Sequence, residues 1–96
     1  MKARLIIRDR RVLADGYLVE VVIWKVPVPV PPGGHDLKYR LFYGRKGERI
    51  IGYDNERGKG DHRHLGEAEE AYAFTSLEQL LDDFERDVSA IRKGKL

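Results

Sequence analysis

Residues 75–93 decide the fold, and they read TSLEQLLDDFERDVSAIRK. Thr75 and Ser76 each stand three positions before a glutamate or glutamine, which is the capping-box pattern of a helix N-terminus. An apolar stripe then recurs at helical spacing, made of Leu77, Leu80, Leu81, Phe84, Val88 and Ile91. The remaining helix surface carries the acids Glu78, Asp82, Asp83, Glu85 and Asp87. The stretch therefore predicts an amphipathic C-terminal helix with an acidic outer face.

The chain before this helix carries strand patterns. Runs of β-branched residues and alternation of aromatic with basic residues predict strands over residues 3–8, 17–26, 37–43 and 48–53, with a short further strand at 72–74. Strands followed by one amphipathic helix indicate an α+β fold. We expect an antiparallel four- to five-stranded sheet with the C-terminal amphipathic helix packed on one face, forming a single domain over residues 1–96.

One helix covers only part of such a sheet, so the second face is either polar or an interface. A homodimer or a bound partner on that face is therefore an expectation. Residues 26–34 (VPVPVPPGG) join two of the predicted strands, and their alternate prolines remove the backbone donors that a sheet interior needs. We interpret this proline strip as a stiff extended connection, with a docking strip for a partner as the alternative.

The composition fits a soluble globular protein, because 42% of the residues are hydrophobic and 35% are charged. No stretch approaches the roughly 20 apolar residues that a membrane span needs, and the first residues lack the plan of a signal peptide. The absence of cysteine excludes disulfides and thiolate metal sites. We therefore expect a cytoplasmic protein that does not enter a membrane.

Charge is divided unevenly along the chain. Residues 1–66 hold 14 Lys or Arg against 8 Asp or Glu, a balance of +6, whereas residues 67–96 hold 4 against 8, a balance of −4. Together the two balances give the net charge of +2. A cationic body favours phosphate polyanions such as RNA, although two solvated faces would give the same count.

Residues 52–64, which read GYDNERGKGDHRH, concentrate the side chains suited to chemistry. His62 and His64 can exchange protons near neutral pH, and an extended backbone would point both to one face. Cutting RNA without a metal needs a base for the 2′-hydroxyl, an acid for the leaving oxygen and cations on the phosphate. We assign the acid–base roles to His62 and His64, with Asp54 or Asp61 orienting an imidazole. The residues predicted to bind nucleic acid are Arg40, Tyr53, Arg57, Lys59 and Arg63.

Three other interpretations of this segment stay open. Asp, Asn and Gly are ordinary turn residues, so the segment could be a solvated structural loop. The same basic loop could bind nucleic acid or a protein without cleaving anything. A metal ion could instead lie between the two histidines, and its shell would be completed by Asp54, Asp61 or His35. The spacing fixes no third ligand, so we assign no metal and no other cofactor.

The run from Tyr53 to His64 follows a KYRL strand at 38–41 and precedes the predicted helix, and it resembles the TumE family of toxin–antitoxin toxins. The early segments RLIIR and DGYLVEVVIWKVP also fit, so the likeness covers nearly the whole chain. The resemblance implies a small cytoplasmic bacterial or archaeal protein, encoded beside a DNA-binding antitoxin that neutralises it. With the residue chemistry, it predicts a toxin that acts as a metal-independent endoribonuclease, or else a non-catalytic binding module.

Overall fold

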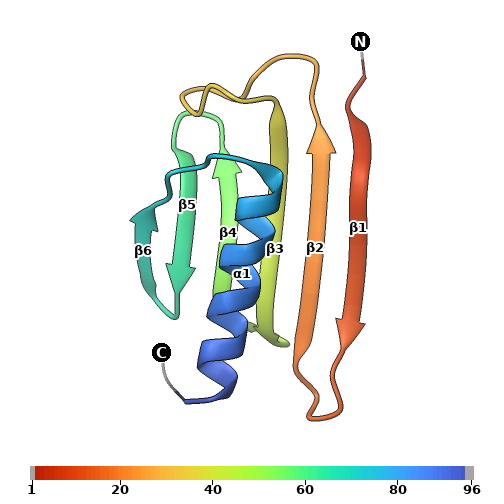
Figure 1. The fold of residues 1–96 in the computed structure, drawn as a ribbon, viewed down its shortest axis with the longest axis vertical. Helices are drawn as coiled ribbons and strands as arrows, with labels where there is room; N and C mark the ends of the chain where they lie inside the picture. The colour runs from red at the N-terminus through yellow and green to blue at the C-terminus, as the bar shows by residue number, and fades with distance from the viewer. Residues whose placement is uncertain (1, 95–96) are drawn as a thin grey trace.

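Six antiparallel strands form one sheet in chain order, and a single helix follows them (Figure 1). The computed structural model describes residues 2–94. Its elements are β1 (Arg4–Val12), β2 (Leu18–Lys25), β3 (Leu37–Arg45), β4 (Glu48–Glu56), β5 (Gly60–Leu65), β6 (Ala68–Ala71) and α1 (Leu77–Arg92). The predicted α+β fold with a C-terminal helix is confirmed, whereas the predicted four to five strands are too few.

The extra strand is β5, and the last strand lies elsewhere than predicted. The glycine-rich stretch 52–64 is a hairpin rather than a loop: it contains the end of β4, the turn at 57–59 and most of β5. Gly58 lies in the turn and Gly60 directly follows it, with φ of +86° and +79°, a region that glycine adopts without steric cost. The last strand lies at 68–71 instead of 72–74, and it pairs with residues 62–65 of β5.

Alternate residues of each strand point to opposite faces of the sheet. One set is buried beneath α1 and forms the core, together with Leu80 and Phe84 of the helix. Its sheet members are Val19, Val21, Ile23, Tyr39, Leu41, Tyr43, Ile51 and Tyr53. The predicted alternation along residues 37–43 is thus confirmed. The other set points away from α1, onto what we call the open face of the sheet.

Helix α1 begins after Ser76, whose hydroxyl oxygen accepts a hydrogen bond from the Gln79 N–H at 3.1 Å. The helix crosses the sheet in front of β3 and β4 (Figure 1). Strand β1 lies outside its cover, at the edge of the sheet, and nearly all of its residues are exposed. Helix α1 therefore buries the middle of one face, and no element of residues 2–94 forms a layer over the open face.

Two acids of α1 point inward. Asp83 and Asp87 are only 9% and 5% exposed, so the prediction that they lie on the outer helix surface is wrong. Tyr72 Oη donates a hydrogen bond to Asp83 at 2.6 Å, and Tyr53 Oη donates one to Asp87. A buried carboxylate is costly unless it is paired or hydrogen-bonded, and Tyr53 of β4 and Tyr72, which follows β6, supply such partners. Helical spacing alone did not reveal them, because polar residues usually mark the solvent side.

The proline strip joins β2 to β3 outside the sheet. Its Pro31 carbonyl oxygen accepts a hydrogen bond from the Gly58 N–H at 2.9 Å, so the strip lies against the β4–β5 turn. At the start of the strip, the Val26 N–H donates to the Asp36 carbonyl oxygen at 2.8 Å. Within residues 2–94, no helix is both long enough and apolar enough to cross a membrane.

Candidate functional site on the open face

His62 and His64 lie on β5 with one residue between them, and both point to the open face. In the β4–β5 register, His62 is opposite Asp54 and His64 is opposite Gly52. Arg63, the residue between them, points to the helix face and contacts α1. The extended backbone of β5 therefore gives the two imidazoles the shared face that their spacing predicts.

The His64 ring lies between two side chains of opposite charge. Its Nδ1 is 3.0 Å from Arg49 Nη2, and its Nε2 is 3.6 Å from Asp54 Oδ1. Arginine has donors but no acceptor, so Nδ1 offers its lone pair and the ring hydrogen is on Nε2, toward the carboxylate. In this arrangement His64 accepts through Nδ1, which faces an exposed arginine.

Arg49 is a site residue that the sequence does not single out. An irregularity in the β3–β4 register skips one residue of β4, and this places Arg49 on the open face. Its side chain then crosses Gly52, where an added methyl group would lie 2.6 Å from Arg49 Cδ. Because Gly52 is opposite His64, the missing side chain opens the path from Arg49 to the imidazole. The only sequence signal is a glycine three residues after an arginine, which has no meaning until the register is known.

His62 has a different set of neighbours. Its Nε2 is 2.7 Å from the Lys59 carbonyl oxygen, and its Nδ1 is 3.2 Å from Glu69 Oε1. The second contact is an ion-pair distance without hydrogen-bond alignment, and Nδ1 is shielded from solvent. A carbonyl oxygen can only accept, so His62 Nε2 carries a hydrogen and donates it to Lys59. The site therefore presents His62 as a proton donor.

Glu69 of β6 is the acid that faces His62, and it was not among the predicted site residues. Its Oε1 is also 3.4 Å from Lys59 Nζ. Desolvation alone would raise the pKa of Glu69, but Lys59 and the two imidazoles outweigh it and lower that pKa. Glu69 is therefore ionised at neutral pH, which keeps a negative charge next to the His62 ring.

Arg40 and Asp54 lie in the same row across the sheet as His62, on β3 and β4. Arg40 is exposed, and Asp54 is half-buried beside the imidazoles. Arg57 and Lys59 lie in the β4–β5 turn at the end of the open face, and both are exposed. The structure thus brings four of the predicted site residues together on one face, with the two turn cations at its margin.

Tyr53 and Arg63 lie on the opposite face, beneath α1. Tyr53 is 1% exposed, which leaves no ring surface on which a base could stack. Arg63 Nε and Nη2 donate to the Asp87 carboxylate at 2.7 and 2.8 Å, and Nη1 donates to Glu70 at 2.5 Å. Burial and the Asp87 hydrogen bond raise the pKa of Tyr53, and the hydrogen bond to Asp87 raises the pKa of Arg63. The pleat of the strands therefore directs these two predicted contact residues into the helix–sheet interface instead.

The third histidine, His35, lies at the end of the proline strip and contacts Asp61. The Leu37 N–H donates to His35 Nδ1 at 3.3 Å, so the ring hydrogen is on Nε2 and is donated to Asp61 Oδ2 at 2.8 Å. Tyr39 Oη donates to the same carboxylate oxygen at 2.6 Å, and burial together with Asp61 raises the pKa of Tyr39. This cluster anchors the proline strip to β5 on the helix side of the sheet.

No group of three histidine, aspartate or glutamate side chains within residues 2–94 is arranged to hold a metal ion. Asp61 and His35, two of the side chains considered as further metal ligands, lie on the helix side of the sheet. Asp54 stays on the open face, next to His64. The open face thus offers two imidazoles flanked by carboxylates and cations, a set suited to proton transfer beside a phosphate.

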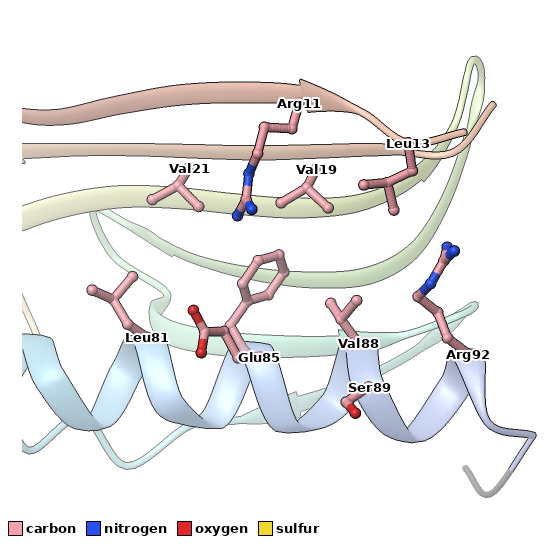
Figure 2. A pocket seen from close by; sticks show the side chains of 10 residues that line it. Arg11, Leu13, Val19, Val21, Leu81, Glu85, Val88, Ser89 and Arg92 are labelled. Atoms are coloured by element: carbon pink, nitrogen blue, oxygen red, sulfur yellow. The ribbon is translucent and has the colours of Figure 1, made fainter. Parts of the chain in front are cut away.

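A concave region lies on the helix side of the sheet, between α1 and the strands β1 and β2. Figure 2 shows Val19 and Val21 of the sheet across from Leu81 and Val88 of the helix. The hollow measures about 360 Å³, and its charged lining residues are Arg11, Glu85 and Arg92. It contains neither a histidine nor an acid–base pair facing a common point, so the open face is the better candidate site.

The family model described as Toxin TumE matches residues 2–92. Searches of curated proteins and of solved structures found no significant match. The matched range extends from before β1 to the end of α1, and it includes both imidazoles of β5 and the residues that contact them. This family consists of toxins of toxin–antitoxin systems, which implies a cognate antitoxin as partner. The chain belongs to the TumE toxin family.

Proposed function

We propose that this toxin binds RNA on the open face of its sheet and cleaves it as a metal-independent endoribonuclease. One observation carries the proposal, namely the unequal surroundings of the two imidazoles. His64 presents a lone pair to a cation, and His62 presents its ring nitrogens to two acceptors. A base and an acid on one face, two residues apart, are the pair that RNA cleavage needs.

In the proposed reaction, His64 removes the proton of a ribose 2′-hydroxyl, and the 2′-oxygen attacks the adjacent phosphorus. The bond from phosphorus to the 5′-oxygen of the next nucleotide breaks, and His62 protonates that oxygen. The products are a 2′,3′-cyclic phosphate and a 5′-hydroxyl, with no change of oxidation state. Proton exchange with water then returns both imidazoles to their starting forms.

Arg49 links substrate binding to the base. Its guanidinium is held by His64 in the absence of substrate, and a phosphate on the open face competes for it. When Arg49 turns to the phosphate, it releases His64 Nδ1, the nitrogen that accepts the 2′-proton. Arg40 supplies another exposed cation in the His62 row, and both guanidinium groups can stabilise the charge that the phosphate gains in the transition state.

A second candidate function is binding of RNA or a protein by the same face, without cleavage. It is favoured by the low exposure of His64, 7%, and by Arg49, which already occupies the Nδ1 nitrogen of its ring. In that case, Arg49 and His64 form a fixed contact surface. The two functions differ in one outcome: a binding module leaves RNA intact after prolonged incubation, and its affinity falls steeply as salt rises.

The proposed partner is a DNA-binding antitoxin encoded beside the toxin gene, and the proposed compartment is the cytoplasm, where RNA is available. Co-expression of the protein encoded next to this gene checks the partner directly. Restored growth and a co-purifying complex support the pairing. A neighbouring protein that neither binds the toxin nor restores growth would contradict it.

Expression of the wild-type chain in a bacterial host should arrest growth, and His62→Ala or His64→Ala should relieve the arrest. Loss of a working general acid or base lowers a rate by about 100-fold or more, which is enough to free the host. Immunoblots and circular dichroism check that both variants accumulate and fold. Arrest that survives both substitutions would remove the catalytic assignment and leave the binding function.

A further inference from the structure

The open face extends beyond the imidazoles, onto β3, β2 and β1. One row across the sheet contains Arg8, Val22, Arg40, Asp54 and His62. Strands about 4.8 Å apart place Arg40 about 10 Å from both Arg8 and His62. Among residues 2–94, neither Arg8 nor Arg40 lies within ion-pair distance of a carboxylate. The row therefore extends from His62 to β1, and its two arginines have no carboxylate partner.

A hollow of about 280 Å³ lies beside this row, and Trp24, Val22, Lys38, Tyr39 and Arg40 line it. Trp24 is the only tryptophan in the chain and is partly exposed on the open face, whereas the core lies on the other face. An indole with an aliphatic neighbour and two cations around it offers a surface for stacking a flat aromatic ring. Such a surface fits a nucleobase that is attached to a phosphate backbone.

We infer that this hollow is a nucleobase-binding subsite and that the substrate is single-stranded RNA laid across β1 to β5. The inference rests on the proposed function, since it extends the same face. A duplex keeps its base faces inside the stack, so only an unpaired base can lie against Trp24. Arg8 and Arg40 are placed to contact backbone phosphates on either side of that base. Charge thus selects a polyanion, and Trp24 selects one with exposed rings.

Trp24 lies three strands from His62 across the sheet and two residues further along its own strand, which gives a separation of about 15 Å. The base on Trp24 therefore belongs to a nucleotide outside the pair that flanks the scissile phosphate. Loss of Trp24 should raise KM for long single strands without lowering kcat. A dinucleotide substrate, which is too short to reach Trp24, should be cleaved equally well with or without the indole.

The test uses the intrinsic fluorescence of Trp24, which reports on this subsite alone because the chain has no other tryptophan. The probe is a short 2′-O-methyl RNA, which lacks the 2′-hydroxyl that cleavage needs, offered as a single strand and as a blunt duplex. The single strand should quench the fluorescence saturably, and the duplex should not. Trp24→Ala should weaken binding of the labelled single strand about ten-fold in fluorescence anisotropy, and Trp24→Phe should weaken it less.

Two arginines of β1 provide a matched control. Arg8 and Arg11 are both exposed, but Arg8 points to the open face and Arg11 to the helix side. Arg8→Ala should weaken binding of the single strand, whereas Arg11→Ala should leave it unchanged. Equal losses in the two variants would contradict a strand that follows the Arg8–His62 row.

The outcomes separate the subsite from the nuclease. If the duplex quenches Trp24 as well as the single strand does, or if the single strand binds without quenching, the subsite is overturned while cleavage at the imidazoles stands. Equal quenching by polyglutamate would also overturn it and indicate a surface for an acidic protein segment. Saturable quenching by the single strand alone, in a protein that leaves RNA intact, supports the subsite and overturns the nuclease.

Discussion

At the scale of single residues, the pleat of β5 decides which charged groups can meet a substrate. His62 and His64 point to the open face, and Arg63 between them points to Asp87 of the helix. The spacing of the two histidines predicted their shared face on the condition that the backbone is extended, as it is in β5. The position of Arg63 followed from the same alternation, yet its basic side chain was assigned to RNA because no sequence pattern revealed a buried acid on α1. Tyr53 was misassigned for the same reason, since its partner is also Asp87.

The hydrogen bonds of the buried Asp83 predict how the free energy of unfolding changes at low pH. Burial alone would raise the pKa of Asp83, but hydrogen bonds from Tyr72, Gln79 and Arg86 outweigh it and lower the pKa below its usual 3.8. Because the unfolded chain then binds the proton first, this stabilisation is complete above about pH 5 and is lost as pH falls through 3.8 to the folded pKa. Asp83→Asn should therefore lower the free energy of unfolding by about 1–3 kcal/mol at pH 6 and by clearly less at pH 3.

Urea unfolding at the two pH values measures this difference. Asp82→Asn is the matched control, because Asp82 is its exposed neighbour on the same helix. The control variant should match the wild-type stability at pH 6. A deficit in Asp83→Asn that is as large at pH 3 as at pH 6 would contradict the proposed role of the ionised carboxylate.

At the scale of elements, the β4–β5 hairpin carries most of the candidate site. The sequence predicted a loop in place of this hairpin. Three glycines and several turn-forming residues within 52–64 predict a loop, but two of the glycines only close a turn between long strands. The third, Gly52, lies within β4 and lets Arg49 cross to His64. No local propensity distinguishes a glycine that ends a strand from one that makes room for a neighbour. The β3–β4 register was needed to find Arg49, which contacts His64, the proposed base, from the neighbouring strand.

This arrangement predicts that Gly52 acts on RNA cleavage only through Arg49. Arg49→Ala should lower the cleavage rate by about 100-fold, the usual order of magnitude for a lost transition-state donor. Gly52→Ala should approach the same loss, because its methyl group would displace the Arg49 side chain. The double variant should be no slower than Arg49→Ala alone.

Rates of the four proteins in this cycle, measured on one single-stranded RNA, give the coupling directly. Nitrogen-15 NMR of the His64 ring supplies a second observable, because the wild type should show the hydrogen on Nε2 and both single variants should lose this preference. Strictly additive losses, or an unchanged His64 spectrum in Gly52→Ala, would show that Gly52 does not act through Arg49.

At the scale of the whole molecule, the six strands of the described residues separate a face packed against α1 from the open face, where we propose that RNA binds. The sequence predicted the α+β class and the covering helix because both depend on local periodicity. It could not show that α1 uses two of its acids internally, so the proposed contrast between a basic body and an acidic outer helix is weaker than the charge balance indicates. What remains is a sheet with one face buried under α1 and the other carrying both β5 imidazoles among exposed arginines.

The most direct test of the account compares the three histidines in one assay. Purified wild-type protein should cleave a single-stranded RNA in the presence of a chelator, leaving 2′,3′-cyclic phosphate ends. His62→Gln and His64→Gln should each lower the rate by about 100-fold or more. His35→Gln should retain it, because His35 lies with Asp61 on the helix side of the sheet. RNA that stays intact, or cleavage that both open-face variants perform at the wild-type rate, would contradict the assignment of the open face as the nuclease site.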